Sequence, residues 1–134
     1  MAEGQDRVAD AARIALAAVR LVNGTAALVA PAAVGRRLGV DPETNRAALY
    51  VMRLFGARTV LIGSDLLLRD SALRARALRV AVLIHASDAA AAAIAGARRQ
   101  LPPRAAATAA LISGANVGLA LLAGRGTRRK RGSL

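Results

Sequence analysis

The segment that decides the fold is "AAATAALISGANVGLALLAG", residues 105–124, a run of 20 residues without a charged side chain. A transmembrane helix needs about 17–25 predominantly apolar residues to cross a hydrocarbon core roughly 30 Å thick. A helix of a soluble bundle presents charged residues along one face, and this segment has none to present. We therefore predict that residues 105–124 form a membrane-spanning helix.

Three earlier windows of similar length are also bounded by arginine. They cover residues 14–35, 47–68 and 80–97. Unlike the last window they contain ionisable residues: Arg20 in the first, Arg53, Arg58 and Asp65 in the second, and His85 and Asp88 in the third. Because a charge at the bilayer centre costs about 2.5–3.5 kcal/mol on insertion scales, we expect the second and third helices to insert as partners.

The four windows together predict the fold class. They predict an all-α, up-down-up-down transmembrane bundle of four helices. The membrane domain is expected to cover residues 1–124, and residues 125–134 are expected to form a basic C-terminal tail.

Composition restricts the class of protein. The 134 residues are 55% hydrophobic and 1% aromatic and carry a net charge of +12, and the mean hydropathy is +0.39. A basic excess is typical of nucleic-acid binding, of contact with an anionic membrane, or of the flanks of membrane spans. The arginines bound the windows, which favours the flanks, and the chain has only one Tyr and one Phe that could stack on bases. We expect the lipid bilayer as partner, and no nucleic acid.

The sequence has no recognisable site for catalysis or for a cofactor. It contains no cysteine and one histidine, which leaves no disulfide and no metal-ligand spacing. A nucleotide fingerprint, a phosphate loop and a nucleophile elbow are also missing from it. We therefore expect a protein that is not an enzyme and that holds no metal or cofactor.

Two other interpretations compete with the membrane bundle. An alanine-rich soluble four-helix bundle, including one that binds DNA, would stay in the aqueous phase without detergent. A cleaved signal peptide is disfavoured because "MAEGQDRVADAAR", residues 1–13, is mixed in charge and Arg20 interrupts the apolar run.

Turn residues mark the connections between the predicted helices. Pro31 is expected to kink or end the first helix. Asp41 is expected to cap the second helix, with Pro42 as its first residue. Asp70 or Ser71 is expected to cap the third helix.

Counts of arginine and lysine on the two sides predict the orientation. With the N-terminus inside, the inner segments carry eleven: Arg7, Arg13, Arg69, Arg74, Arg76, Arg79, Arg125, Arg128, Arg129, Lys130 and Arg131. The outer loops carry six: Arg36, Arg37, Arg46, Arg98, Arg99 and Arg104. Both termini are therefore predicted to be cytoplasmic in a bacterial inner membrane, although six outer arginines keep the inverted topology open. The last four basic residues also predict contact with anionic lipid, worth about 1 kcal/mol per residue near the surface.

A first layer of polar residues is expected near the bilayer midplane. Counted inward from the cytoplasmic arginine of each window at about 1.5 Å per residue, four residues lie roughly 13–17 Å deep: Asn23, Arg58, Asp88 and Asn116. Lone intramembrane charges pair and turn toward the bundle interior. We predict an Arg58–Asp88 ion pair surrounded by hydrogen bonds from Asn23 and Asn116.

A second layer lies roughly 6–11 Å deep by the same count and contains Arg20, Asp65 and His85. We predict a contact between Arg20 and Asp65, with His85 between the two layers. The whole cluster has two interpretations. Its polar contacts fix which helices face each other, or Arg58, His85 and Asp88 bind a small polar or quinone-like ligand or a proton.

Small residues predict close helix packing. Gly114 and Gly118 form a GxxxG pattern in the last window, and Gly56 and Gly63 lie on the second. Such spacing lets helix backbones approach each other. The glycines are expected to serve packing within the chain or the interface of a homodimer.

Two motifs resemble a family of small bacterial four-span membrane proteins of unknown function. "RLFGARTVLIGSDLLLR", residues 53–69, is followed by "HASDAAAA", residues 85–92. The family has a Gly-Ala-Arg motif and a later glycine on its second span, which Gly56, Ala57, Arg58 and Gly63 match. Its third span carries an Asp preceded by a His, matched by Asp88 and His85. "RRLGV", residues 36–40, resembles the family's first loop, and the resemblance covers most of residues 12–120.

The resemblance implies a four-span fold and no established activity. A looser similarity to DoxX-like membrane proteins, some linked to quinone or thiol redox systems, implies a redox-accessory role, but a chain without cysteine has no thiol chemistry of its own. The expected function is that of a small membrane-embedded accessory or interaction protein. The alternative is a transporter-like or redox-linked protein that binds its ligand at Arg58, His85 and Asp88.

Overall fold

The computed structural model describes the backbone of residues 2–131 and the side chains of residues 3–125. The described chain has five helices and no strand: α1 (Ala2–Val29), α2 (Pro31–Arg37), α3 (Arg46–Asp65), α4 (Ser71–Ala97) and α5 (Pro103–Arg131). Four of these helices are long and apolar enough to cross a membrane: Glu3–Val29, Arg46–Asp65, Ser71–Ala97 and Pro103–Arg125. The predicted all-α class with four long helices is confirmed.

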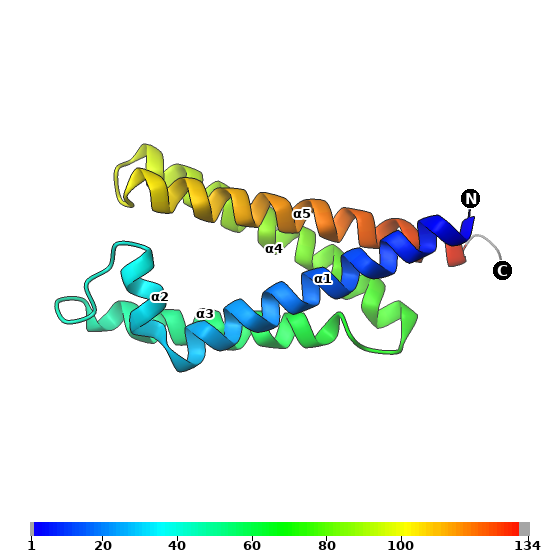
Figure 1. The fold of residues 1–134 in the computed structure, drawn as a ribbon, viewed down its shortest axis with the longest axis horizontal. Coiled ribbons are helices and arrows are strands. Elements are labelled where there is room, and N and C mark those ends of the chain that lie inside the picture. The colour runs from blue at the N-terminus through cyan, green and yellow to red at the C-terminus, as the bar shows by residue number, and fades with distance from the viewer. Residues whose placement is uncertain (1, 132–134) are drawn as a thin grey trace.

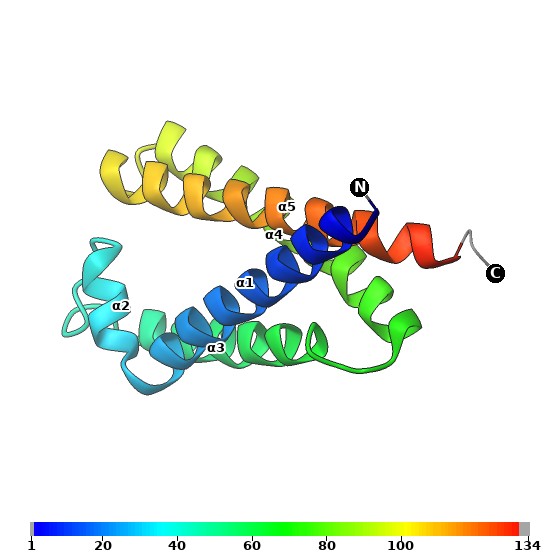
Figure 2. The ribbon, with the colours of Figure 1, turned by 45° about the vertical axis from the view of Figure 1, so that its right-hand side comes forward.

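The long helices form two antiparallel hairpins (Figure 1). The first hairpin consists of α1 and α3, with the short α2 between them in sequence, and the second consists of α4 and α5. The hairpins converge at the end of the bundle where both termini lie, which we call the terminal end, and α1 packs on α5 there. Toward the opposite end, which we call the α2 end, the hairpins diverge (Figure 2).

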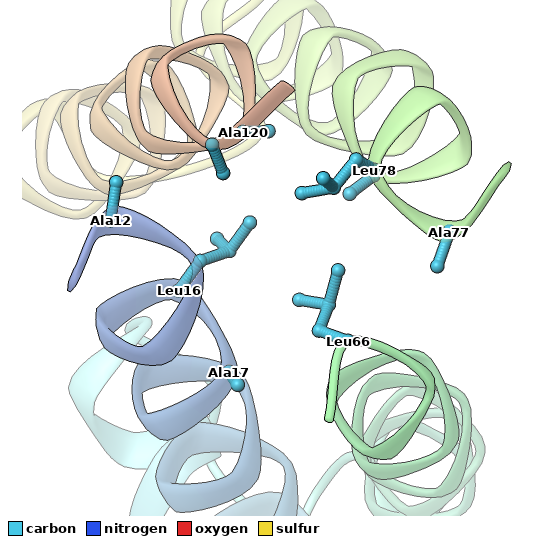
Figure 3. Packing of buried hydrophobic residues seen from close by; sticks show 9 residues of the cluster. Ala12, Leu16, Ala17, Leu66, Ala77, Leu78 and Ala120 are labelled. Atoms are coloured by element: carbon cyan, nitrogen blue, oxygen red, sulfur yellow. The ribbon is translucent and has the colours of Figure 1, made fainter. Parts of the chain in front are cut away.

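The hydrophobic core lies at the terminal end. Its buried members are Ala12, Leu16, Ala17, Leu66, Ala77, Leu78, Ala81, Ala120 and Ala123. In Figure 3 the side chains of Leu16, Leu66 and Leu78 point toward one another from the first hairpin and from α4. The other core residues are alanines of α1, α4 and α5, whose small side chains let these three helices approach closely.

The outer surface of the long helices is apolar. Large apolar side chains are exposed on every one of them, including Val22, Leu61, Leu83 and Leu111. Scattered apolar residues are normal on a soluble protein, but extensive apolar surface needs a partner phase. Lipid supplies that phase for helices of this length.

Two of the predicted helix boundaries are confirmed. α1 ends at Val29, and Pro31 opens α2 as a separate short helix. Asp70 caps α4, because its carboxylate accepts the backbone N–H groups of Ala72 and Leu73, both at 2.8 Å. At the other end of the chain, α5 continues through Arg131, so the backbone of the predicted tail is helical as far as that residue.

The predicted cap at Asp41 is wrong. α3 begins at Arg46, and the side chain of Asn45 accepts the N–H of Ala48 at 3.1 Å. The carboxylate of Asp41 instead accepts the N–H of Glu43 at 3.0 Å and the hydroxyl of Thr44 at 2.9 Å. Such a turn uses the same acceptor that capping needs, and Thr44 is engaged in the turn as well, so the helix starts after Asn45.

Gly39 lies at the α2 end of the bundle, where it approaches the loop between α4 and α5. Its φ of +79° is in the left-handed region, and a Cβ at this position would lie 2.6 Å from Cγ of Pro102. Only glycine combines that backbone conformation with so close an approach. The loop after α2 therefore rests on the loop between α4 and α5.

The turn at Asp41 is expected to depend on pH. The N–H of Glu43, and then the hydroxyl of Thr44, lower the pKa of Asp41. A carboxylate with a lowered pKa in the folded state stabilises it above the unfolded pKa of about 3.9, and this stabilisation is lost as the pH falls through the folded pKa. The amide signals of Glu43 and Thr44 in an NMR titration should move with a midpoint below that value. Asp41→Asn should abolish the transition, and a midpoint at or above the unfolded value would contradict the turn.

Candidate functional site

Among the described side chains, each long helix contributes one buried polar residue. They are Arg20 on α1, Thr59 on α3, His85 on α4 and Asn116 on α5. Arg20 is 2% exposed and is among the largest fully buried side chains. Buried polar groups in a lipid-embedded bundle are costly unless they find partners, so their contacts decide what the cluster can do.

Arg20 is bonded to His85. Nη1 of Arg20 is within hydrogen-bonding distance of Nε2 of His85. A guanidinium can only donate, so Nε2 of His85 must accept and the histidine is neutral with its proton on Nδ1. The contact joins α1 of the first hairpin to α4 of the second.

Arg58 and Asp88 form an ion pair. Nη2 of Arg58 lies 3.4 Å from Oδ1 of Asp88, and the side chains are 48% and 30% exposed. The separation exceeds the 2.7–2.9 Å or so of a short charge-assisted hydrogen bond. Cζ of Arg58 also lies 5.5 Å from the ring centroid of Phe55, within range of a cation–π contact. The predicted pair is present, and it joins α3 to α4.

Both polar contacts connect the same two hairpins. His85 and Asp88 are three residues apart on α4 and therefore share a face. His85 contacts Arg20 of α1, and Asp88 contacts Arg58 of α3. Both lie beyond Ala81, the last residue of α4 in the apolar core. The polar contacts thus extend the junction of the hairpins past the core toward the α2 end.

The predicted contact between Arg20 and Asp65 is not formed in the described part of the chain, because Arg20 bonds to His85. A Cβ on Gly63 would lie 3.1 Å from Cβ of Arg20, so Gly63 faces that residue. Residues two apart on a helix do not share a face. Asp65 is therefore turned away and is exposed at the end of α3.

The two predicted asparagines are not arranged around the ion pair. Asn23 is exposed on α1. Asn116 is buried on α5, but no hydrogen bond joins it to Arg58 or Asp88 among the described side chains. Depth counting placed these residues at one level of the bundle but did not give the angle of each around its helix.

Two features of the cluster escaped the sequence reasoning. The Arg20–His85 contact was missed because opposite charges were paired first, although both residues lie in the shallower layer. Thr59 was not considered, because a threonine in an apolar window gives no signal of its own. Nε of Arg20 and Oγ1 of Thr59 are buried without a hydrogen-bond partner in the described chain.

Glycines bring α1 and α3 together. A Cβ on Gly56 would lie 2.7 Å from the carbonyl oxygen of Gly24 and 2.8 Å from the backbone nitrogen of Leu28. Gly63 faces Arg20, as described above. Gly24, which the sequence analysis did not single out, is thus part of the crossing. The glycines of the first hairpin let the backbones meet, as small residues do between membrane helices.

The GxxxG pattern of α5 is not used in this way. A Cβ on Gly114 or Gly118 would meet no atom within 4 Å in the described structure. The expected packing of these glycines within the chain is therefore not found. Their expected role in a homodimer stays a prediction. The side chains of Arg128, Arg129, Lys130 and Arg131, predicted to contact anionic lipid, lie outside the described side chains.

Comparison with protein-family models, with curated proteins and with solved structures gives no match to this chain. Its class is defined by its own geometry. Four long apolar helices with an apolar outer surface are those of a multi-pass α-helical membrane protein.

Proposed function

We propose that the chain is a small integral membrane protein without enzymatic activity, acting as an accessory or interaction protein. Its intramembrane polar cluster holds the two hairpins in one arrangement. The observation that carries the proposal is that Arg20–His85 and Arg58–Asp88 both cross between the hairpins. Each pair is a direct contact between two side chains of the chain itself, so a bound ligand is not needed to explain it.

The exposure of the ion pair supports an interaction role. Arg58 is 48% exposed although it lies in the middle of α3. An ionised side chain that faces lipid is costly, and such residues turn toward protein or toward a polar cavity. The exposed part of this pair is therefore a surface that a polar group of another membrane protein would cover.

An exchange of the two charges tests the structural role. Arg58→Leu and Asp88→Asn are each expected to lower the stability of the detergent-solubilised protein by about 1 kcal/mol, as for polar contacts between membrane helices. Arg58→Asp combined with Asp88→Arg should recover much of the loss, because the ion pair is restored with its partners reversed. Thermal unfolding and accumulation in membranes measure the effect.

Arg53→Leu is the matched control for this exchange. Arg53 is exposed on the same helix, and no hydrogen bond or ion pair is assigned to it among the described residues. The control should leave stability close to that of the parent. If the exchanged pair is no more stable than either single variant, the ion pair does not hold the hairpins together.

The second candidate is a transporter-like or redox-linked protein that binds a small polar or quinone-like ligand at Arg58, His85 and Asp88. It is favoured by the buried Nε of Arg20, which has no hydrogen-bond partner among the described residues, together with a partly exposed ion pair. Native mass spectrometry of the purified protein tests it. A small molecule that co-purifies with the parent and is lost in Asp88→Asn would replace the first proposal with this one.

For the location we propose a bacterial inner membrane with both termini in the cytoplasm. Supporting this, the N- and C-termini lie at the same end of the bundle, and that side carries the larger number of arginines. The cysteine-free chain allows single-cysteine labelling. With a membrane-impermeant maleimide, Glu43→Cys should react in intact cells and Glu3→Cys only after lysis. The reverse pattern would establish the inverted topology.

We also propose that the chain belongs to the four-span family that its motifs resemble. Supporting this, the motif residues take part in contacts between helices. Gly56 lies at the α1–α3 crossing, and Arg58, His85 and Asp88 form the polar links. A family defined by such residues would share a fold rather than a reaction.

A further inference from the structure

A cavity of about 310 Å³ lies between α4 and α5. Its size is at the lower end of the range for pockets that hold small molecules. Leu78 and Val82 of α4 and Leu121 of α5 provide apolar walls, and Arg79 and Arg125 also line it. The cavity is therefore apolar in one part and strongly basic in another.

The basic and the apolar residues of the cavity lie at different depths in the membrane. Arg79 and Arg125 bound the predicted spans on the terminal side. α4 begins on the terminal side and its chain runs into the membrane, so Val82 lies deeper than Arg79. The chain of α5 runs toward the terminal side, so Leu121 lies deeper than Arg125. The basic part of the cavity thus lies toward the water interface and the apolar part toward the hydrocarbon.

The two arginines are available for an anion. Both are exposed, and neither is paired with a carboxylate among the described side chains. A guanidinium binds phosphate through two parallel N–H groups and is weakly hydrated, which suits an interfacial site. Basic pockets between membrane helices are known to take lipid headgroups.

We propose that this cavity binds an anionic phospholipid from the leaflet on the terminal side. The phosphate lies between Arg79 and Arg125, and the start of an acyl chain lies along Val82 and Leu121. The charge of the two arginines selects an anionic headgroup, and the apolar walls select a lipid over free phosphate. The inference rests on the chain spanning a membrane, but not on the polar cluster or on an interaction role.

A tryptophan reporter tests the proposal, because the chain has no tryptophan of its own. Leu121→Trp places the reporter at the cavity, where the leucine is 54% exposed. Leu111→Trp, at a residue 73% exposed on the same helix, places a second reporter away from it. Each variant is reconstituted in phosphatidylcholine vesicles that contain increasing fractions of brominated phosphatidylglycerol, which quenches tryptophan on contact.

Quenching at position 121 should saturate at a lower fraction of anionic lipid than quenching at position 111. Adding Arg79→Gln or Arg125→Gln to the Leu121→Trp variant should weaken the apparent affinity on the order of fivefold for each arginine. The control is Arg98→Gln combined with Arg104→Gln, which removes two arginines at the opposite ends of the same helices. This control should change the apparent affinity for anionic lipid little. Circular dichroism verifies that each variant folds.

The possible outcomes are distinct. The lipid site would be overturned if the quenching curves at positions 121 and 111 were equal. It would also be overturned if the apparent affinity were unchanged after both Arg79 and Arg125 were replaced. Brominated phosphatidylcholine is the separate test of the membrane itself. If it quenches neither reporter, the helices do not contact lipid, and the membrane assignment fails together with the site.

Discussion

Replacement of Gly56 by leucine is expected to force α1 away from α3 and to destabilise the first hairpin. Even a Cβ at this position would lie 2.7 Å from the carbonyl oxygen of Gly24 and 2.8 Å from the nitrogen of Leu28. These are backbone atoms, which cannot turn aside as the end of a side chain can. Overpacking costs typically 1–3 kcal/mol and occasionally more, and we expect about 3 kcal/mol here. Thermal unfolding in detergent measures the loss.

Gly114→Leu is the control for this prediction. Gly114 is also a glycine within a long apolar helix, but a Cβ there meets nothing within 4 Å in the described structure. The leucine should therefore be tolerated, with a melting temperature close to that of the parent. Gly56→Ala provides the stricter test, since it adds only the Cβ. A Gly56→Ala protein as stable as the parent would show that the two backbones do not approach this closely.

The second large effect is expected from His85→Leu. It removes the acceptor of the Arg20 side chain, which is 2% exposed. A buried guanidinium without an acceptor has an unsatisfied N–H donor, and leaving a buried donor unsatisfied costs about 1–3 kcal/mol, with more for a charged group. We expect the hairpins to separate beyond the apolar core. The same thermal unfolding measurement, and the amount of protein recovered from membranes, should both fall.

The double variant distinguishes a specific contact from a general loss of packing. Arg20→Leu with His85→Leu removes both polar groups and leaves apolar side chains in their place. It should be more stable than His85→Leu alone, because replacing both members of a buried pair is often close to neutral. Ser87→Ala, a change on the same helix that removes only a bond to the carbonyl of Ile84, should have little effect. Strictly additive losses from Arg20→Leu and His85→Leu would refute the contact.

Much of the fold followed from the distribution of charge along the chain. The apolar windows between arginines predicted four long helices, since a helix that crosses lipid must be apolar over about 20 residues. The positions of Pro31 and Asp70 predicted where helices end and begin, because proline lacks the N–H that continues a helix and aspartate accepts the first free N–H groups. The Asp41 turn shows the limit of such local reasoning, because two side chains, at positions 41 and 45, could each serve as the cap.

The candidate site followed from the sequence only in part. Depth along each helix can be counted from the chain, and it placed Arg58 and Asp88 at one level, where the ion pair is found. It also placed Arg20 and His85 at one level. Which of these side chains meet depends on how each helix is rotated about its axis, and a count of residues contains no information about that rotation. The contact predicted between Arg20 and Asp65 was wrong for this reason.

The sequence by itself determined that this protein has four apolar helices, polar residues at two depths, and a basic end. The tertiary structure decided which faces meet. Gly24, Gly56 and Gly63 bring α1 onto α3, and Arg20 of α1 meets His85 of α4. Gly114 and Gly118 of α5, in contrast, face no other helix in the described structure. The physical reason is that lipid accepts any apolar helix face equally well, so the choice between faces depends on shape and polar contacts that form only when the helices are together.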